Sequence, residues 1–347
     1  MNELELLCKS FKSDFAPRIK DSKRPVRCWS EKDFFNGKVV DTFVIIFRTR
    51  GCSWALNSGC SMCGYFNDSL WDNVSDKDLL FQFDSVMKKY SNEKFVKIFT
   101  SGSFLDDTEI SPYAKDKILT ILKKNADKIS VESRPNYITN KSLSNIRDVL
   151  NGKTFEVGVG LESSNDFILK NSINKGFTFK DYKAAANNLK KFNYLLKTYV
   201  LLKPPFLTEK ESINDSVKTI KDIDSYTDII SLNPTNVQRN TLVNYLWKRK
   251  QYRPPWIWSI IEVLRQSKKI TNKPVKCDVV GGGSIRGAHN CRICDKNLIK
   301  LIEKFSLSQD ISIFNDINCG CKDRWFDQLD IENLCFGSLV DFSRSVI

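Results

Sequence analysis

Residues 39–65 read VVDTFVIIFRTRGCSWALNSGCSMCGY. The first part, residues 39–48, is rich in Val, Ile and Phe and mostly apolar on both faces, which is typical of a strand buried in a parallel sheet. The part that follows places Cys52, Cys60 and Cys63 in one glycine-containing loop. Because α/β folds keep their functional side chains at the carboxyl ends of strands, we expect a functional site in this loop.

Three cysteines are an informative number for a metal site. Structural zinc sites and protein-bound iron–sulfur clusters usually have four protein ligands. Three thiolates on a four-iron cluster leave one iron open to an external ligand. The loop therefore favours a 4Fe–4S cluster, and the alternatives are a three-thiolate zinc site or cysteines that only pack.

Similar apolar stretches recur along the chain, and amphipathic segments separate them. Further strands are expected at residues 95–100, 129–133, 154–161, 194–202 and 228–232. Helices are expected at residues 75–90, 111–125, 140–150 and 179–192, and after the capping box at residues 208–211. This alternation predicts a parallel α/β fold over residues 39–272, either doubly wound or an open barrel.

Two flanking regions stand outside the alternation. Residues 1–38 are expected to form a helical extension, since residues 1–15 alternate charged and apolar side chains. Pro274 and the glycine run 281–283 interrupt the pattern at the other end. Residues 273–347 hold six of the eleven cysteines, so we expect a small metal-binding appendage there.

Composition limits the class of protein. The N-terminus lacks the basic-then-apolar order of a signal peptide, and no apolar run approaches the roughly 20 residues that span a bilayer. We therefore expect a cytoplasmic protein with no membrane partner. Thiols stay reduced in that compartment, so eleven cysteines favour metal sites over disulfides. The one histidine, His289, leaves thiolate as the main metal ligand.

A second set of cysteines lies near the C-terminus, as a C-x2-C pair and a C-x-C pair. The set is Cys291, Cys294, Cys319 and Cys321. Four thiolates suit a closed tetrahedral site, so structural zinc is the first expectation. An auxiliary iron–sulfur cluster is the alternative, because thiolate suits both. Cys277 and Cys335 are possible replacement ligands.

The positive charge is concentrated in one segment. The chain has a net charge of +13, and residues 241–300 hold 13 Lys and Arg against three acids. Aromatic residues are interleaved there, at positions 245, 247, 252, 256 and 258. Such a segment favours contact with phosphates and stacking on bases, and the alternative is a solvated basic face over core aromatics. The candidate nucleic-acid contacts are Lys248, Arg249, Lys250 and Arg253.

These motifs together resemble the radical S-adenosylmethionine (SAM) superfamily, in its elongator-like branch. The resemblance rests on C-x7-C-x2-C after the first strand, TSGSF at 100–104, VESRP at 131–135 and EVGVGLES at 156–163. It implies a partial (β/α)6 barrel related to the TIM barrel, with a 4Fe–4S cluster on the three loop cysteines. The residues it implies for SAM are Tyr65, Gly102, Ser103, Glu132, Ser133, Arg134, Glu162 and Ser163.

Within that superfamily the chain looks most like the archaeal radical SAM family of archaeosine synthesis. The stretches that carry this likeness include LLKPPFLTEKE at 201–211, LNPTNVQ at 232–238, RPPWIWSIIEVL at 253–264 and GGGSIRGAHNCRIC at 281–294. The resemblance implies that archaeosine synthase attaches lysine to a 7-cyano-7-deazaguanine base in the tRNA D-loop. The radical enzyme, fed by an external electron donor, then breaks a carbon–nitrogen bond of that lysine.

Candidate residues for the chemistry itself lie at the ends of the later strands. They are Lys203, Asn236 and Gln238, with Asn233 beside them, and capping or turn roles are the alternative for each. Three other functions remain open. They are methylthio or acyl transfer to tRNA, a radical reaction on a small molecule, and a non-enzymatic zinc protein that binds RNA.

Overall fold

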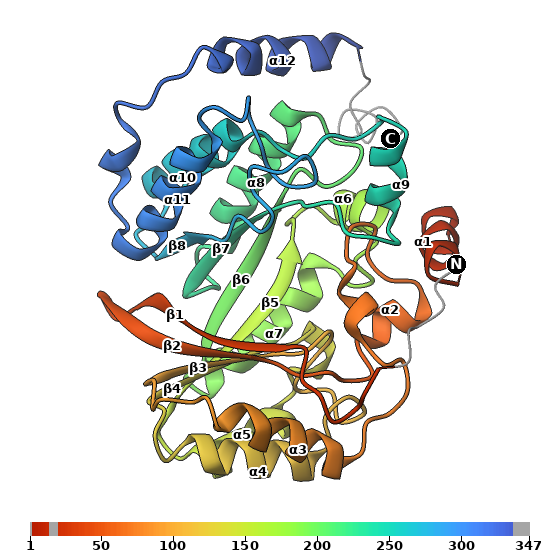
Figure 1. Cartoon of the computed structure of the whole chain (residues 1–347), viewed down its shortest axis with the longest axis vertical. Coiled ribbons are helices and arrows are strands. Elements are labelled where there is room, and N and C mark those ends of the chain that lie inside the picture. Colours follow the sequence, from red (N-terminus) through yellow and green to blue (C-terminus); the bar gives the residue numbers. More distant parts are fainter. Residues whose placement is uncertain (1, 14–19, 336–347) are drawn as a thin grey trace.

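The computed structural model of the chain describes residues 2–13 and 20–335. Its centre is one eight-stranded sheet whose strands lie in chain order from β1 to β8 (Figure 1). The pair β1–β2 is antiparallel, and every later pair is parallel. Within the described chain β1 and β8 share no hydrogen-bonded ladder, so the sheet is an open, curled partial barrel. The α/β fold expected from the sequence is confirmed, with two strands more than the six predicted.

The elements are arranged on both sides of this sheet. The strands are β1 (Arg27–Phe35), β2 (Lys38–Ile46), β3 (Phe95–Phe99), β4 (Lys128–Glu132), β5 (Thr154–Glu162), β6 (Leu195–Leu202), β7 (Ile229–Pro234) and β8 (Val275–Cys277). The helices are α1 (Glu3–Ser13), α2 (Ser53–Asn57), α3 (Asp76–Met87), α4 (Pro112–Leu122), α5 (Asn140–Leu150), α6 (Asp166–Ile168), α7 (Phe179–Lys191), α8 (Glu209–Ile223), α9 (Leu242–Lys248), α10 (Ile257–Ile270), α11 (Asp295–Ser308) and α12 (Cys321–Cys335). In Figure 1, α3, α4 and α5 lie together below the sheet, and α1, α2 and α9 gather at its right.

Local signals explain where the helices begin. Ser75 and Ser111 each accept a hydrogen bond from a backbone N–H in the first turn of α3 and of α4. Thr208 and Glu211 form the capping box of α8 that the sequence predicted. The predicted helices and the six predicted strands are confirmed to within a few residues.

The two ends of the sheet differ from the sequence prediction. Residues 27–35, expected within a helical extension, form β1 and pair with β2. The hairpin turn is Asn36–Gly37, and both residues have positive φ, 49° and 76°, as a type I′ turn requires. At the other end, β8 extends the sheet beyond residue 272. The cysteine-rich C-terminal region therefore contributes a strand to the barrel.

The interior face of the sheet also differs from the sequence prediction. The strands were expected to be mostly apolar on both faces, but this face carries charged side chains. The Lys97 amine lies 2.6 Å from the Asp33 carboxylate, and the Lys128 amine lies 2.5 Å from Glu156. Lys276 of β8 pairs with the same Asp33 of β1, so an ion pair crosses the open edge of the sheet. All five side chains are buried. The opposite face is the apolar one, and it packs under the helices.

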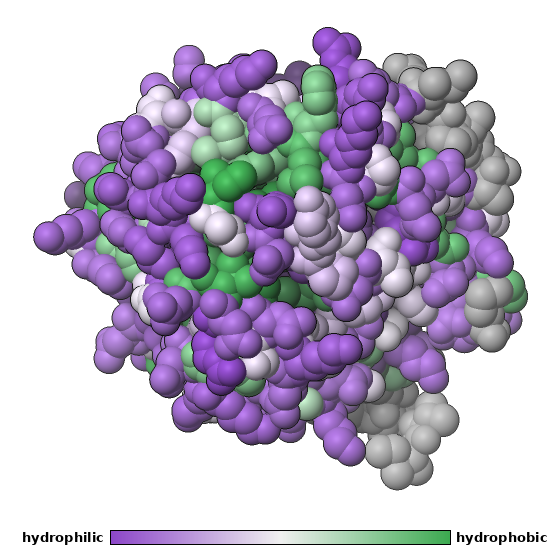
Figure 2. Space-filling model, turned by 90° about the horizontal axis from the view of Figure 1, so that it is seen from below, coloured by the Kyte–Doolittle hydropathy of each residue, from purple (hydrophilic) through white to green (hydrophobic). Residues whose placement is uncertain are grey.

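The face of the molecule drawn in Figure 2 is mostly hydrophilic. Seen from below, Figure 2 shows hydrophobic side chains gathered in a central band and hydrophilic ones over the rest of that face. Among the described residues, no helix combines the length and the apolar character needed to cross a bilayer.

We expect the Lys128–Glu156 pair to be important for stability. Replacing Lys128 with Met leaves the 2 % exposed Glu156 carboxylate without its cation, which should lower the free energy of unfolding by about 3–5 kcal/mol. The measurement is the urea midpoint of the purified protein. Lys32→Met is the matched control, since Lys32 and Asp41 are 61 % and 67 % exposed and their pair should contribute less than about 1 kcal/mol. Equal midpoints for the two variants would contradict this account.

Candidate functional site

The loop with three cysteines follows β2 at the carboxyl edge of the sheet. Cys52 precedes the short helix α2, and Cys60 and Cys63 follow it. All three side chains are half-buried. Burial raises the pKa of the Cys52 thiol, and it raises that of Cys63 to about 12, with the neighbouring Cys60 adding to both shifts. The three thiols therefore share one space, and they need a positive centre to be held as thiolates.

Their spacing bears on the kind of metal site. A single ion with four sulfurs about 2.3 Å from it has sulfurs about 3.8 Å apart. In the described part of the chain, the side chains gathered closely enough to hold an ion are those of the four C-terminal cysteines, and the three loop cysteines do not form such a group. The loop cysteines are therefore not arranged as the ligand set of a single tetrahedral ion.

Hydrogen bonds from other parts of the chain hold the loop in place. The Asn174 side-chain amide donates to the Ser58 hydroxyl and to the Gly59 carbonyl, both at 2.8 Å. Its backbone carbonyl accepts from the Trp54 indole at 2.8 Å. Asn174 is 3 % exposed and has a left-handed backbone, with φ 56°. The shape of the loop is thus fixed by partners other than the thiols.

A lysine of the N-terminal helix also reaches this loop. Lys12 of α1 is 5 % exposed, and its amine donates to the Ser58 carbonyl. Burial lowers the pKa of Lys12, and the nearby thiols of Cys60 and Cys63 act in the opposite direction. A positive charge therefore lies beside the cysteines, as suits a site that binds them as thiolates.

The turn after β3 packs directly on the first cysteine. A Cβ placed on Gly102 would lie 2.7 Å from the Cys52 Cα, so only glycine fits there. Glu109 lies beneath the turn and accepts hydrogen bonds from the Thr49 hydroxyl and the Ser103 backbone N–H. Burial raises the pKa of Glu109 to about 7. This carboxyl group ties the start of the cysteine loop to the predicted SAM-binding turn.

Two acidic residues from neighbouring strands face the same space. Glu132 ends β4 and is hydrogen-bonded to the Tyr199 hydroxyl, and burial raises its pKa. Glu162 ends β5, is 8 % exposed and lies 2.8 Å from the Lys175 amine. Desolvation by the surrounding protein raises the pKa of Tyr65 although 57 % of this residue is exposed, and the charges of Cys63, Glu132 and Glu162 add to that shift. Tyr65, Glu132 and Glu162, which were predicted separately, are therefore brought together beside the cysteines.

Three other residues predicted for SAM, Ser133, Arg134 and Ser163, make contacts within the protein. The Ser163 hydroxyl donates to buried Asp215 at 2.8 Å, and the Ser133 hydroxyl donates to the Arg134 carbonyl at 3.2 Å. Arg134 lies between the rings of Trp54 and Phe177, 5.6 and 5.1 Å from their centroids. Its guanidinium donates to the carbonyls of residues 175 and 176.

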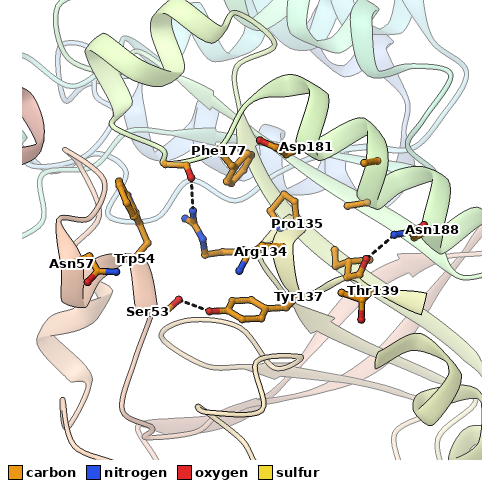
Figure 3. Close-up of a pocket in the computed structure, with 15 residues that line it drawn as sticks. Ser53, Trp54, Asn57, Arg134, Pro135, Tyr137, Thr139, Phe177, Asp181 and Asn188 are labelled. Atoms are coloured by element: carbon orange, nitrogen blue, oxygen red, sulfur yellow. Dashed lines mark hydrogen bonds between the residues drawn. The ribbon is translucent and has the colours of Figure 1, made fainter. Parts of the chain in front are cut away.

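Arg134 borders a pocket of about 610 Å³ beside the loop (Figure 3). Trp54, Tyr137 and Phe177 line it, and Figure 3 shows the Tyr137 hydroxyl directed at Ser53 of α2, a bond of 2.7 Å. The pocket thus lies on the outer side of the cysteine loop, next to α7.

The candidates on the later strands have different surroundings. Gln238 accepts a hydrogen bond from the Gly64 backbone and bonds with Tyr65, so it lies beside the cysteine loop. Asn236 is half-buried. Lys203 is 5 % exposed and its amine is paired with buried Glu209 at 2.5 Å. Its amine is therefore already engaged within the protein.

The basic segment is only partly a surface. Lys248, Arg249 and Lys250 are exposed at the end of α9, and the Arg249 guanidinium stacks on Tyr245 at 3.7 Å. The Arg253 guanidinium instead donates to the carbonyls of Pro254 and His289. Three of the five aromatic residues are buried and cannot stack on bases: Tyr252, Trp256 and Trp258.

The four C-terminal cysteines form a compact group. Their sulfurs all lie within 4.8 Å of one another, and three of the pairs are 3.7–3.8 Å apart. These distances match the edge of about 3.8 Å expected around a single tetrahedral ion. The Trp258 indole and the Asn290 amide donate to two of the sulfurs. Burial opposes ionisation of Cys291, but backbone N–H groups lower its pKa to about 7.

The C-terminal cysteines therefore form a group that could hold a metal ion, and their spacing is the one expected around a single ion. Cys277 is buried and is not a member of this ligand group. The Cys335 side chain falls outside the described part of the chain.

Curated proteins with similar sequences cover nearly the whole chain. A Methanosarcina acetivorans protein named archaeosine synthase subunit beta is 42 % identical over 322 residues, which are 91 % of this chain and 93 % of that protein. A Thermococcus kodakarensis protein of the same name is 38 % identical over 305 residues, 86 % of this chain and 94 % of that one. The chain belongs to the archaeosine synthase subunit beta family. No protein-family model matches it.

Solved structures resemble this archaeosine synthase subunit beta homologue only distantly. An N-terminally shortened Elp3 of Methanocaldococcus infernus has a TM-score of 0.49 and 19 % identity, and the match covers 66 % of this chain and 57 % of that one. Methylornithine synthase has a TM-score of 0.48 and 12 % identity, with coverages of 79 % and 69 %.

Several residues at the site of this family member give little signal in the sequence. Lys12, Glu109 and Asn174 hold the cysteine loop, yet each lies in a segment without a recognisable motif. Lys175 lies between β5 and α7, and the sequence alone gives no separate signal for its pairing with Glu162. Their roles depend on contacts between segments far apart in the chain, which spacing alone does not reveal.

We expect the C-terminal group to bind one metal ion per chain. Cys319→Ser should lower the bound metal well below one equivalent, because it removes one of four thiolates. Elemental analysis of the purified protein measures this, and cobalt substitution should give a tetrahedral thiolate spectrum. Cys28→Ser, at a half-exposed cysteine of β1, is the control. Iron and inorganic sulfide that disappear in Cys319→Ser would instead indicate a cluster at this site.

Proposed function

We propose that this chain is a cytoplasmic radical SAM enzyme of tRNA modification, which acts on a lysine-modified 7-cyano-7-deazaguanine in the D-loop to form archaeosine. The observation that carries the proposal is the group of Cys63, Tyr65, Glu132 and Glu162 around one space at the carboxyl edge of an open barrel. Family membership supports the choice of substrate, since relatives are named as archaeosine synthase subunits.

The residues present fit a four-iron cluster. Cys52, Cys60 and Cys63 would hold it, they do not form a close group of the kind that holds a single ion, and Lys12 places a positive charge beside them. When bound with SAM, such a cluster supplies one-electron cleavage of SAM and hence a 5′-deoxyadenosyl radical, which takes a hydrogen atom from the substrate. Glu109 would hold the cysteine loop and the Gly102 turn in fixed positions relative to each other.

Other side chains would position the two substrates. Glu132 and Glu162, which lie near Tyr65, would accept hydrogen bonds from the hydroxyl or amino groups of SAM. The backbone of Gly102 and Ser103 would receive its amino group. Gln238, beside Tyr65, is the remaining candidate for contact with the modified base. Lys203 would affect the site only indirectly, because its amine is paired with Glu209.

The outer parts of the chain would serve binding and stability. We propose zinc for the four C-terminal cysteines, in a closed structural site. The exposed basic end of α9 would contact tRNA phosphates. Archaeosine synthase would supply the lysine-bearing tRNA, and an external donor would supply electrons.

The reaction can be tested directly. The anaerobically reconstituted protein, given SAM, dithionite and tRNA that carries the lysine-modified base, should form archaeosine together with 5′-deoxyadenosine. Cys60→Ala should abolish both products and most of the iron, because it removes one of three cluster ligands. Mass spectrometry of nucleosides and iron analysis are the measurements.

Cys28→Ala is the control and should retain iron and products. SAM cleavage without any change in the tRNA would favour a small-molecule substrate, and a methylthio or acyl product would favour transfer. Zinc alone, with no SAM cleavage, would mean that the chain is a binding protein.

Phosphate contact by α9 gives a separate prediction. Replacing Lys248, Arg249 and Lys250 with Ala should weaken tRNA binding and reduce the slope of log affinity against log salt by roughly two to three, one contact per lost cation. Filter binding over a salt series measures this. The matched control is Lys88, Lys89 and Lys94 changed to Ala, three exposed lysines next to α3. Equal slopes for both triple variants would show that α9 is not a tRNA contact.

A further inference from the structure

One buried lysine beside the cysteine loop has no acidic partner. Lys12 of α1 is 5 % exposed, and its amine donates to the carbonyl of Ser58 and, at 3.5 Å, to that of Ala55. The amine also lies 5.2 Å from the centroid of the Phe66 ring. Among the described residues, no carboxylate forms an ion pair with it. A buried ammonium that only neutral groups hold is costly unless an anion lies close by.

The loop cysteines can supply that anion. A Cβ placed on Gly59 would overlap the Lys12 amine, so the amine rests against the residue that precedes Cys60. The side chains whose charges act most on the amine are all thiols, namely those of Cys60, Cys63, Cys8 and Cys52. Because a cysteine that holds a metal or a cluster does so as a thiolate, the three loop thiols become anionic when the loop is loaded.

Two other cations near the loop are engaged differently. The Lys175 amine lies 2.8 Å from Glu162, so an acid already balances its charge. Arg134 is only half-buried, and it lies between two aromatic rings and donates to the Lys175 carbonyl. Of the three cations, Lys12 is therefore the one that is buried and has no acid to balance it.

The helix that carries Lys12 is held by contacts that do not use its amine. The Ser58 hydroxyl donates to the Glu5 carbonyl at 2.9 Å, and the ring centroids of Phe11 and Tyr245 are 5.1 Å apart. Cys8, on the same helix, is 3 % exposed. The charge of Lys12 can therefore be removed by substitution while α1 keeps its place beside the loop.

We propose that Lys12 is the counter-ion of the four-iron cluster and raises the potential at which the cluster accepts its electron. This assignment rests on the proposed function, which places the cluster on the loop. On reduction the cluster gains the one electron that the external donor loses, so the site becomes more negative by one charge. A fixed ammonium nearby stabilises the more negative state. Lys12 acts through the cluster and touches neither SAM nor tRNA, so it is a positioning residue and not a catalytic one.

The test is the midpoint potential of the reconstituted cluster, measured by titration with dithionite and electron paramagnetic resonance. Lys12→Met should make the equilibrium constant for one-electron reduction roughly ten- to a hundredfold smaller, which is a shift of about 59–118 mV to lower potential. Lys12→Gln removes the charge but keeps an N–H donor for the Ser58 carbonyl, and it should shift the potential equally. Lys9→Met, at an exposed lysine of the same helix, should leave the potential unchanged.

Iron content and the thermal midpoint of the cluster-free protein show whether each variant folds, and Lys12→Gln decides if Lys12→Met does not. A wild-type potential in Lys12→Met, or its recovery in Lys12→Gln, would overturn the role of the charge. Loss of the cluster from both variants at an unchanged thermal midpoint would support that role, because the counter-ion would then be needed to bind the cluster. Loss of the cluster together with a lower thermal midpoint would make Lys12 a residue of the fold and overturn it.

The wild-type protein separates this inference from the proposed function. A wild type that binds no iron and sulfide would reject the cluster, and the inference with it. A wild type that binds the cluster but forms no archaeosine would reject the proposed substrate, and the shift in potential would still decide the role of Lys12.

Discussion

Parallel strands impose one constraint on which this site depends: each strand delivers its carboxyl end to the same edge of the sheet. β2, β4, β5 and β7 are far apart in the chain, yet the residues that follow or end them meet there. This is how Cys63, Glu132, Glu162 and Gln238 come to surround Tyr65. The loops add detail, but the meeting point is set by strand direction.

The same sheet has two faces with opposite chemistry. Helices cover an apolar outer face, and this packing supplies most of the core. The inner face of an open barrel has no helix to cover it and cannot be filled with apolar side chains without closing the space that a substrate needs. Charged residues line it instead, and pairs such as Lys128 with Glu156 make their burial tolerable.

Much of this could be predicted from the sequence, since strands, caps and cysteine spacings are local signals. The six central strands and the Thr208 cap are examples. β1 was missed although Asn36–Gly37 is a strong hairpin signal, because the amphipathic start of the chain suggested a helix throughout. The charged interior was missed because single lysines in apolar runs, such as Lys97, give no sign of a partner on another strand. Glu109 could not be found at all, since its role exists only once three segments have met.

The hydrogen bonds around the cysteine loop have a consequence for how its shape is held. Asn174, Lys12 and Glu109 shape the region through carbonyl, hydroxyl and backbone groups, and none of these bonds uses a thiol of the loop. The loop therefore keeps its course without relying on its three thiols, which stay available to a ligand. The C-terminal cysteines differ, because three pairs of their sulfurs lie 3.7–3.8 Å apart, and four thiolates at that distance need a positive ion among them. One set of thiols is thus positioned by the rest of the chain, and the other is positioned sulfur against sulfur.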